Sequence, residues 1–237
     1  MAADRGHRIR VAGRHDGTTM TGQLTLDLGS RTAVGREDFL VAPSNAEAVA
    51  WIDRWPDWPG PALALCGPPG CGKTHLGQVW RTRAEAALLA AGAVAGNPES
   101  IVGAATNCII EDADEVGDET AFLHLYNHLA ACGGSLLLCA SMPPSRWKSA
   151  LPDLVSRLRA APVALIGAPD DALIQAVLVK LFADRQLAVA PEVVSYLMGR
   201  IERSFDGARR VVAALDGAAL ASHRRITVPL ARQVLDG

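Results

Sequence analysis

Two kinds of segment alternate over most of the chain, short apolar runs and longer stretches with helical spacing of apolar residues. The apolar runs, which are typical of buried strands, cover residues 62–66, 107–110, 135–140 and 163–166. Helical spacing begins at Ser44 and at Lys73 and recurs over Thr120–Ala131. Residues 86–95 are so rich in alanine that strand and helix both stay open. Short buried strands separated by helices predict an α/β fold, a parallel sheet with helices on both faces.

The pattern changes at both ends of this alternation. After Pro169 only helices are predicted, over residues 170–186, 191–202 and 206–222 and after Pro229. The first 36 residues lack sustained periodicity and are predicted to form a flexible N-terminal arm. We therefore expect an arm over residues 1–36, an α/β domain over 37–168 and a small all-α domain over 169–237.

Composition narrows the class of protein. With 237 residues, 49% hydrophobic and 20% charged, the chain is too apolar to be largely disordered. A net charge of -2 argues against a protein that mainly coats nucleic acid. No apolar run approaches the roughly 18 residues of a membrane span, and no secretory signal is recognisable. The five cysteines fit no zinc motif, so we expect reduced thiols, a cytoplasmic location and no membrane contact.

One glycine-rich loop carries the clearest chemical signal. It fits the pattern G-x-x-x-x-G-K-[ST] between a predicted strand and a predicted helix, and its residues are Gly67, Pro68, Pro69, Gly70, Cys71, Gly72, Lys73 and Thr74. Glycines let backbone amides surround phosphates, Lys73 reaches the terminal phosphates, and the Thr74 hydroxyl binds Mg²⁺. The sequence therefore predicts a nucleotide site.

An acidic cluster follows the strand that ends at Ile110, about 40 residues after this loop. In a P-loop protein this position holds the acid that orients Mg²⁺ and, beside it, the group that positions the attacking water. Glu111 is the expected metal residue and Asp112 the expected catalytic one. A solvated acidic loop is the alternative for such a cluster taken alone.

These motifs resemble a known family. The loop GPPGCGKTHL, the acidic strand end and LPDLVSRL followed by a helical lid resemble AAA+ ATPases of the DnaA initiator clade. The segments FLHLYNHLAACGGSLLLCASMPPSRW and ITVPLARQVL are similar to those of the Hda family, the clamp-associated regulatory inactivators of DnaA. The resemblance runs from about residue 23 to the end of the chain.

The arm contains a hexapeptide that resembles the motif with which this family docks on the DNA polymerase III β sliding clamp. The residues expected to bind the clamp are Gln23, Leu24, Leu26, Asp27 and Leu28. Gln23 can hydrogen-bond at a pocket rim, while the leucines give an extended peptide an apolar face. The alternative is an N-terminal strand that joins the sheet edge or packs on the core.

The resemblance implies roles for further residues. Arg157 matches an arginine finger that acts in trans on a neighbour's nucleotide, with an ordinary surface ion pair as the alternative. Arg209 matches the lid arginine that senses the nucleotide, although the adjacent Arg210 leaves the register open by one residue. Asn45 is expected beside the adenine, and His75 is included in the nucleotide site. The implied ligands are ADP or ATP, with Mg²⁺.

Four departures from the initiators bear on function. Glu111 replaces the usual aspartate, and Ser141-Met142 replaces a polar Ser/Thr-Asp pair. The segment before the acidic strand is short, so we expect no single-strand-contacting insertion, and we expect no helix-turn-helix domain after the lid. We therefore expect a nucleotide-gated regulator with weak intrinsic ATPase activity at most.

The leading hypothesis is a clamp-tethered AAA+ regulator that binds adenine nucleotide and promotes hydrolysis of DnaA-bound ATP. It would regulate the initiation of chromosome replication negatively, meet DNA only indirectly through the clamp, and possess the surface for a homodimer. The alternatives are a DnaA-clade ATPase that remodels protein or loads a helicase, and an adaptor in which nucleotide only holds the domains together. Whether residues 1–19 are native stays open.

Overall fold

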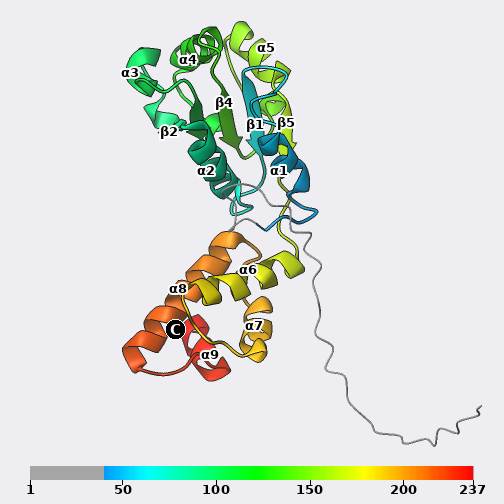
Figure 1. Ribbon diagram of the computed structural model, residues 1–237, viewed down its shortest axis with the longest axis vertical. Coiled ribbons are helices and arrows are strands. Elements are labelled where there is room, and N and C mark those ends of the chain that lie inside the picture. The colour runs from blue at the N-terminus through cyan, green and yellow to red at the C-terminus, as the bar shows by residue number, and fades with distance from the viewer. Residues whose placement is uncertain (1–39, 237) are drawn as a thin grey trace, which may run out of the picture.

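Five parallel strands form a single sheet in the order β2-β3-β4-β1-β5 (Figure 1). The computed structural model describes residues 40–236. The strands are β1 (Ala62–Cys66), β2 (Ala87–Ala90), β3 (Cys108–Glu111), β4 (Leu136–Ala140) and β5 (Val163–Leu165). Four of them lie at the predicted positions, and β2 resolves the open choice in the alanine-rich segment in favour of a strand.

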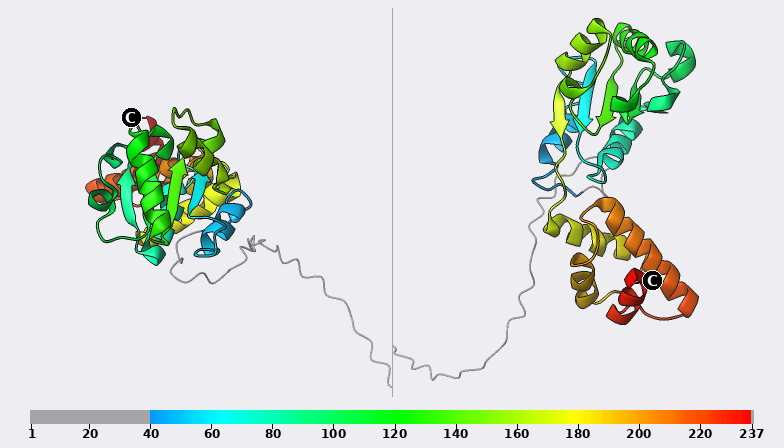
Figure 2. Two further views of the ribbon diagram at one scale, coloured as in Figure 1. Left: turned by 90° about the horizontal axis from the view of Figure 1, so that it is seen from above. Right: turned by 180° about the vertical axis from the view of Figure 1, so that it is seen from behind.

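Helices cover both faces of this sheet, as the sequence predicts (Figure 2). On one face Leu63 and Leu65 of β1 are buried in one core with α1 (Ala46–Asp53) and α2 (Lys73–Ala84). On the other face Ala64 of β1 is buried with residues of three further helices. These are α3 (Pro98–Val102), α4 (Glu119–Ala131) and α5 (Pro152–Ala160). Successive strand residues thus enter opposite cores, because side chains alternate between the two faces of a strand.

The remaining four helices of the described chain form a second domain with its own core (Figure 1). They are α6 (Asp171–Asp184), α7 (Pro191–Met198), α8 (Phe205–Ser222) and α9 (Val228–Asp236). Several boundaries of these helices differ from the sequence prediction by one to four residues. Helix α7 ends before Gly199 and not at residue 202, and α9 includes Pro229 in its first turn. Proline is tolerated there because an N–H group in the first turn has no acceptor within the helix.

The segment ahead of α1 joins the two domains. Ala42 is buried in the core of the helical domain, and Leu40 packs against it. A few residues later, Ser44 accepts a backbone hydrogen bond of 2.8 Å from Gly167, just beyond β5. The carboxyl ends of the strands face the helical domain (Figure 1), so the loops that follow the strands lie at the domain junction.

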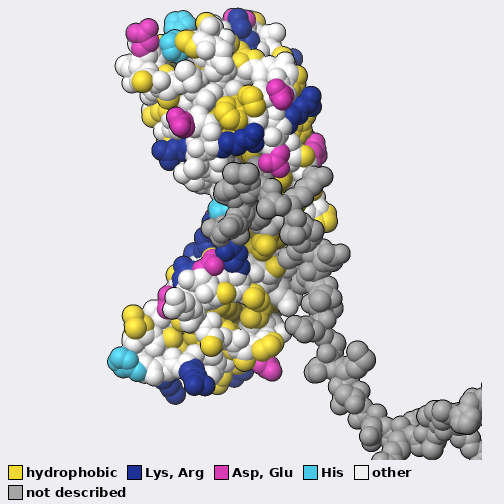
Figure 3. All heavy atoms as spheres, viewed as in Figure 1, with side chains coloured by type: hydrophobic (Ala, Val, Ile, Leu, Met, Phe, Trp, Pro, Cys, Tyr) yellow, Lys and Arg dark blue, Asp and Glu magenta, His cyan; other side chains and the backbone are white. Residues whose placement is uncertain are grey.

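The surface carries charges of both signs on each domain (Figure 3). None of the helices in residues 40–236 is long and apolar enough to cross a membrane.

Candidate functional site: a nucleotide site between the two domains

The glycine-rich loop connects β1 to α2 at the domain junction. Gly70 and Gly72 have φ values of 69° and 103°, which side chains rarely allow, and α2 begins at the next residue, Lys73. The Lys73 ammonium donates hydrogen bonds to the carbonyl oxygens of Gly67 (2.8 Å) and Pro68 (3.1 Å). The loop therefore curls around the lysine at the start of a helix, the geometry that suits a phosphate group.

The two predicted magnesium residues lie together although 37 positions separate them. The Thr74 hydroxyl donates to a carboxylate oxygen of Glu111 at 3.2 Å. Burial raises the pKa of Glu111, and the hydrogen bond from Thr74 opposes that effect in part. Asp112, the next residue, is exposed and has a φ of 52° at the start of a short turn. No cluster of three or more metal-ligating side chains occurs in the described residues, so Mg²⁺ here would need phosphate and water oxygens as well, as it commonly does.

Asp114, for which the sequence predicted no role, connects the ends of β3 and β4. Asp114 accepts a hydrogen bond of 3.1 Å from the backbone N–H of Ser141, which follows β4. The thiol of Cys66, at the end of the neighbouring β1, is buried, and burial raises its pKa to about 12. A thiol with that pKa stays protonated and adds no negative charge near the loop.

The helical domain packs directly on the glycine-rich loop. The N–H of Phe205, the first residue of α8, donates to the carbonyl oxygen of Gly70 at 3.0 Å. A Cβ atom at Gly72 would lie 2.9 Å from the Phe205 ring, and one at Gly70 would lie 2.7 Å from the Cβ of Ser204. Sequence reasoning missed this contact. The sequence feature that could have indicated the start of α8 here is its N-cap residue, Ser204. The Ser204 hydroxyl accepts a hydrogen bond from the N–H of Gly207 at 2.9 Å.

Two adjoining cavities open at this junction. The larger, of about 260 Å³, lies between α2, α6 and α8, and its lining residues are Leu40, His75, Val177, Lys180, Leu181, Asp184, Phe205 and Arg209. The smaller, of about 60 Å³, lies on the loop, and its lining residues are Gly70, Gly72, Lys73, Thr74, His75, Phe205, Asp206 and Arg209. His75, Phe205 and Arg209 line both cavities and join them.

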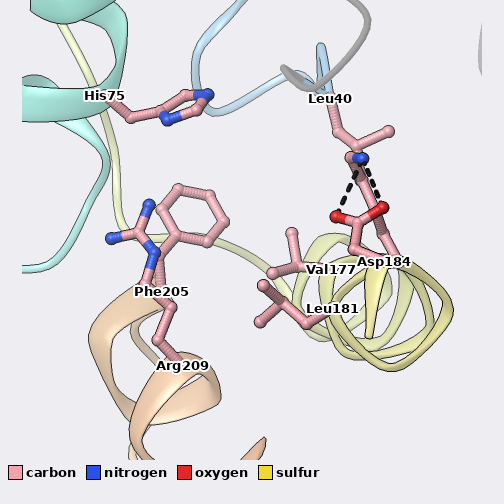
Figure 4. Close-up of a pocket in the computed structure, with 8 residues that line it drawn as sticks. Leu40, His75, Val177, Leu181, Asp184, Phe205 and Arg209 are labelled. Carbon is pink, nitrogen blue, oxygen red and sulfur yellow. Dashed lines mark hydrogen bonds and ion pairs between the residues drawn. The ribbon is translucent and has the colours of Figure 1, made fainter. Parts of the chain in front are cut away.

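Figure 4 shows the larger cavity. The side chains of His75 and Phe205 lie on one side, and Val177 and Leu181 of α6 lie across from them. The guanidinium group of Arg209 lies beside the Phe205 ring. The larger cavity has an apolar wall of Leu40, Val177, Leu181 and Phe205 beside charged side chains, and the smaller cavity has Lys73, Thr74 and Asp206. A partly apolar compartment that continues into a charged one suits a ligand with an aromatic base and phosphate groups.

The structure distinguishes the two adjacent lid arginines. Arg209 lines both cavities and forms an ion pair of 3.1 Å with Asp206. Arg210 instead pairs with Glu202 at 2.6 Å and lines neither cavity. This placement favours Arg209 as the residue that contacts a nucleotide.

Asn45 is buried, with 1% of its surface exposed, and its side chain is used within its own turn. The side-chain oxygen accepts from the N–H of Ala42 at 2.9 Å, and the side-chain amide donates to the carbonyl of Leu40 at 2.9 Å. Asn45 therefore holds the segment that brings Leu40 to the wall of the larger cavity. A direct contact of Asn45 with adenine stays a prediction.

Arg157 lies apart from this site. It belongs to α5, at the end of the α/β domain that is distant from the helical domain (Figure 1). Its guanidinium lies 3.3 Å from Asp153 and 5.7 Å from the ring centre of Tyr126. The side chain is 38% exposed and lines neither cavity. The expected clamp-binding residues, by contrast, lie outside the described part of the chain and stay a prediction.

Comparison with known families identifies the helical domain. Residues 171–235 match the family model for the lid domain of Hda. The chain carries an Hda lid domain. The match covers α6 to α9, and therefore includes Phe205, Asp206 and Arg209 of the candidate site. It confirms the resemblance to the Hda family.

Solved structures identify the fold of the whole described chain. Domain III of the Thermotoga maritima replication initiation protein DnaA has a TM-score of 0.74 and 19% identity, and the match covers 84% of this chain and 94% of that one. AMPPCP-bound DnaA from Aquifex aeolicus has a TM-score of 0.57 and 16% identity over 79% of this chain and 74% of that one. The Thermotoga maritima RuvB branch migration motor reaches 0.58 at 13% identity, over 74% and 61%. The fold is thus an AAA+ α/β domain followed by an Hda lid.

Among curated proteins, an uncharacterized protein of Haemophilus influenzae is 29% identical over 119 residues. The match covers 50% of this chain and 52% of that protein, so the chain spans about half the length of this relative.

Proposed function

We propose that the chain binds ADP or ATP between its AAA+ domain and its Hda lid. The observation that carries this proposal is the pair of joined cavities between Phe205, Arg209 and the glycine-rich loop. Lys73 and Thr74 would hold the phosphates, Glu111 would help to hold Mg²⁺, and the larger cavity would receive the base. Asp112 is the candidate group for positioning water. Magnesium, when bound, would neutralise phosphate charge.

The partner of this nucleotide-bound form is proposed to be the initiator DnaA. The DnaA-like fold and the Hda lid support this choice. Arg157 lies away from the chain's own cavities and remains 38% exposed, which suits an arginine finger that reaches a neighbouring subunit. In trans such a residue contributes about 10³–10⁵ in rate. The chain would thus promote hydrolysis of DnaA-bound ATP and limit new initiation, with weak ATPase activity of its own.

The clamp is proposed to bring regulator and initiator together. The hexapeptide Gln23–Leu28 would dock on the β sliding clamp, so that DNA is met only through the clamp. In this scheme stimulation requires nucleotide, loaded clamp and Arg157 at the same time. Homodimer formation is a further proposal that the same assay can address, through its dependence on protein concentration.

The test follows hydrolysis of labelled ATP bound to DnaA, with this protein, DNA-loaded clamp and ADP added singly and together. We expect acceleration only in the complete mixture. Arg157→Ala should abolish that acceleration and leave clamp binding intact, whereas Arg159→Ala, an exposed arginine in the same helix, should change it little. Equal stimulation by wild type and Arg157→Ala would refute the mechanism.

Two results would select an alternative function. Robust ATP turnover by the protein alone, unaffected by clamp or DnaA, would favour a remodelling or helicase-loading ATPase. Clamp binding without any acceleration would leave a clamp adaptor. Changing Gln23 and Leu26 to Ala tests the hexapeptide separately from the proposed nucleotide site, because neither residue belongs to the glycine-rich loop or to the lid.

A further inference from the structure

Asp206 brings a carboxylate to the smaller cavity, beside the glycine-rich loop. It follows Phe205, whose N–H binds the carbonyl of Gly70 at 3.0 Å and so holds the start of α8 on the loop. The position that a Cβ of Gly70 would occupy lies 3.8 Å from the Asp206 carboxylate. Of the described residues that line this cavity, Asp206 alone is acidic.

This carboxylate offsets one of the positive charges of the cavity. Arg209 is one turn further along α8, and its guanidinium pairs with Asp206 at 3.1 Å. Lys73 and Arg209 contribute two positive charges to the lining, and Asp206 offsets one of them. Glu111 accepts a hydrogen bond from Thr74 and does not line this cavity, and Mg²⁺ held by these two residues would reduce its effect on a phosphate group. The carboxylate of Asp206 pairs with Arg209 and not with a residue expected to hold Mg²⁺, so no metal ion would reduce its effect on a phosphate group.

We propose that Asp206 determines how strongly the site discriminates between nucleoside diphosphates and triphosphates. Its carboxylate competes with phosphate oxygens for Arg209 and disfavours the additional negative charge of a triphosphate. This inference rests on the proposed nucleotide site. It concerns the ratio of two affinities and not the existence of binding.

The expected size of the effect is modest, because both partners are partly open to solvent. The side chains of Arg209 and Asp206 are 48% and 55% exposed, so water screens their interaction with a phosphate group. For a single charge at a partly exposed site, removal of Asp206 should shift the ratio of the two dissociation constants by roughly threefold to tenfold in favour of the triphosphate.

The experiment measures the dissociation constants of ADP and ATP, each with Mg²⁺, by isothermal titration calorimetry on the full chain. Asp206→Asn should raise the affinity for both nucleotides and raise that for ATP more. Asp206→Glu, which retains the charge, should keep the wild-type ratio. The difference between wild type and Asp206→Asn should shrink as salt is raised, because added ions screen the charge.

Glu202→Gln is the matched control. It removes a carboxylate that pairs with Arg210 on the lid surface, at 2.6 Å, outside both cavities, and it should leave the ratio unchanged. A purely structural role of Asp206 in the first turn of α8 would change folding stability and both affinities equally. Binding of both nucleotides by Asp206→Asn with the wild-type ratio would overturn this inference, whereas absence of binding in the wild type would overturn the proposed nucleotide site.

Discussion

Gly72→Ala tests the contact between lid and glycine-rich loop most directly. Gly72 has a φ of 103° and immediately precedes α2. A Cβ atom there would lie 2.9 Å and 3.1 Å from two ring carbons of Phe205. Phe205 is 9% exposed, belongs to the buried core of the lid and lines both cavities, so a shift of its ring away from the added Cβ would disturb either that core or the cavities. The substitution should therefore weaken both the loop and the attachment of the lid.

Two contributions set the expected loss of stability. A left-handed backbone costs a residue with a side chain about 1–2 kcal/mol. Insertion of a methyl group against a packed ring adds about 1–3 kcal/mol. Together they predict a loss of about 2–5 kcal/mol in the free energy of unfolding.

The assay is urea unfolding followed by tryptophan fluorescence and by circular dichroism. All five tryptophans lie between residues 51 and 147, so fluorescence reports the AAA+ domain, while circular dichroism reports the helices of both domains. Gly96→Ala is the matched control, because Gly96 also has a positive φ, of 84°, but nothing lies within 4 Å of its added Cβ. The control should lose only the backbone contribution.

A Phe205→Ala background separates the two contributions. Without the ring, Gly72→Ala should cost only the backbone contribution of about 1–2 kcal/mol, which leaves a coupling of about 1–3 kcal/mol between the two positions. If Gly72→Ala costs the same with and without Phe205, and no more than Gly96→Ala, the lid does not pack on the loop as described.

The remaining predictions concern the lid core and the thiols. Leu215→Ala, at a residue with 0% exposure in α8, should cost about 2–5 kcal/mol in urea unfolding, whereas Leu220→Ala, at 74% exposure in the same helix, should change stability little. Equal losses would contradict the assigned lid core. At pH 8 one thiol of the five should react quickly with a thiol reagent, the exposed Cys132, and Cys132→Ser should abolish that phase. Burial raises the pKa of Cys66 and Cys108 to about 12, so both stay protonated until the protein unfolds; fast reaction of either in the folded protein would contradict their burial.

Local pattern was sufficient for most elements. The apolar run at Ala62–Cys66 forms a strand in which every residue is buried on one face or the other of the sheet. A continuous apolar run is therefore the pattern expected for it. The stretch Thr120–Ala131 became α4, which starts one residue earlier with Asp118 as its cap. The short helices α3 and α5 were missed. Each begins with a proline, at Pro98 and Pro152, a residue that the first helical turn favours, and the five residues of α3 are too few to show a helical period.

The sequence by itself determined which residues come together at the strand ends, because a glycine-rich loop after one strand and an acidic end of another strand are local patterns. Lys73, Thr74 and Glu111 could be named from their spacing alone, since parallel strands bring their carboxyl ends to one edge of the sheet. Tertiary structure alone decided what the lid contributes. The N–H of Phe205 meets Gly70 across 135 positions of sequence, and the choice between Arg209 and Arg210 follows from which side of α8 faces the loop. Such a choice depends on the packing of two domains, which hydrophobic periodicity within one helix does not specify.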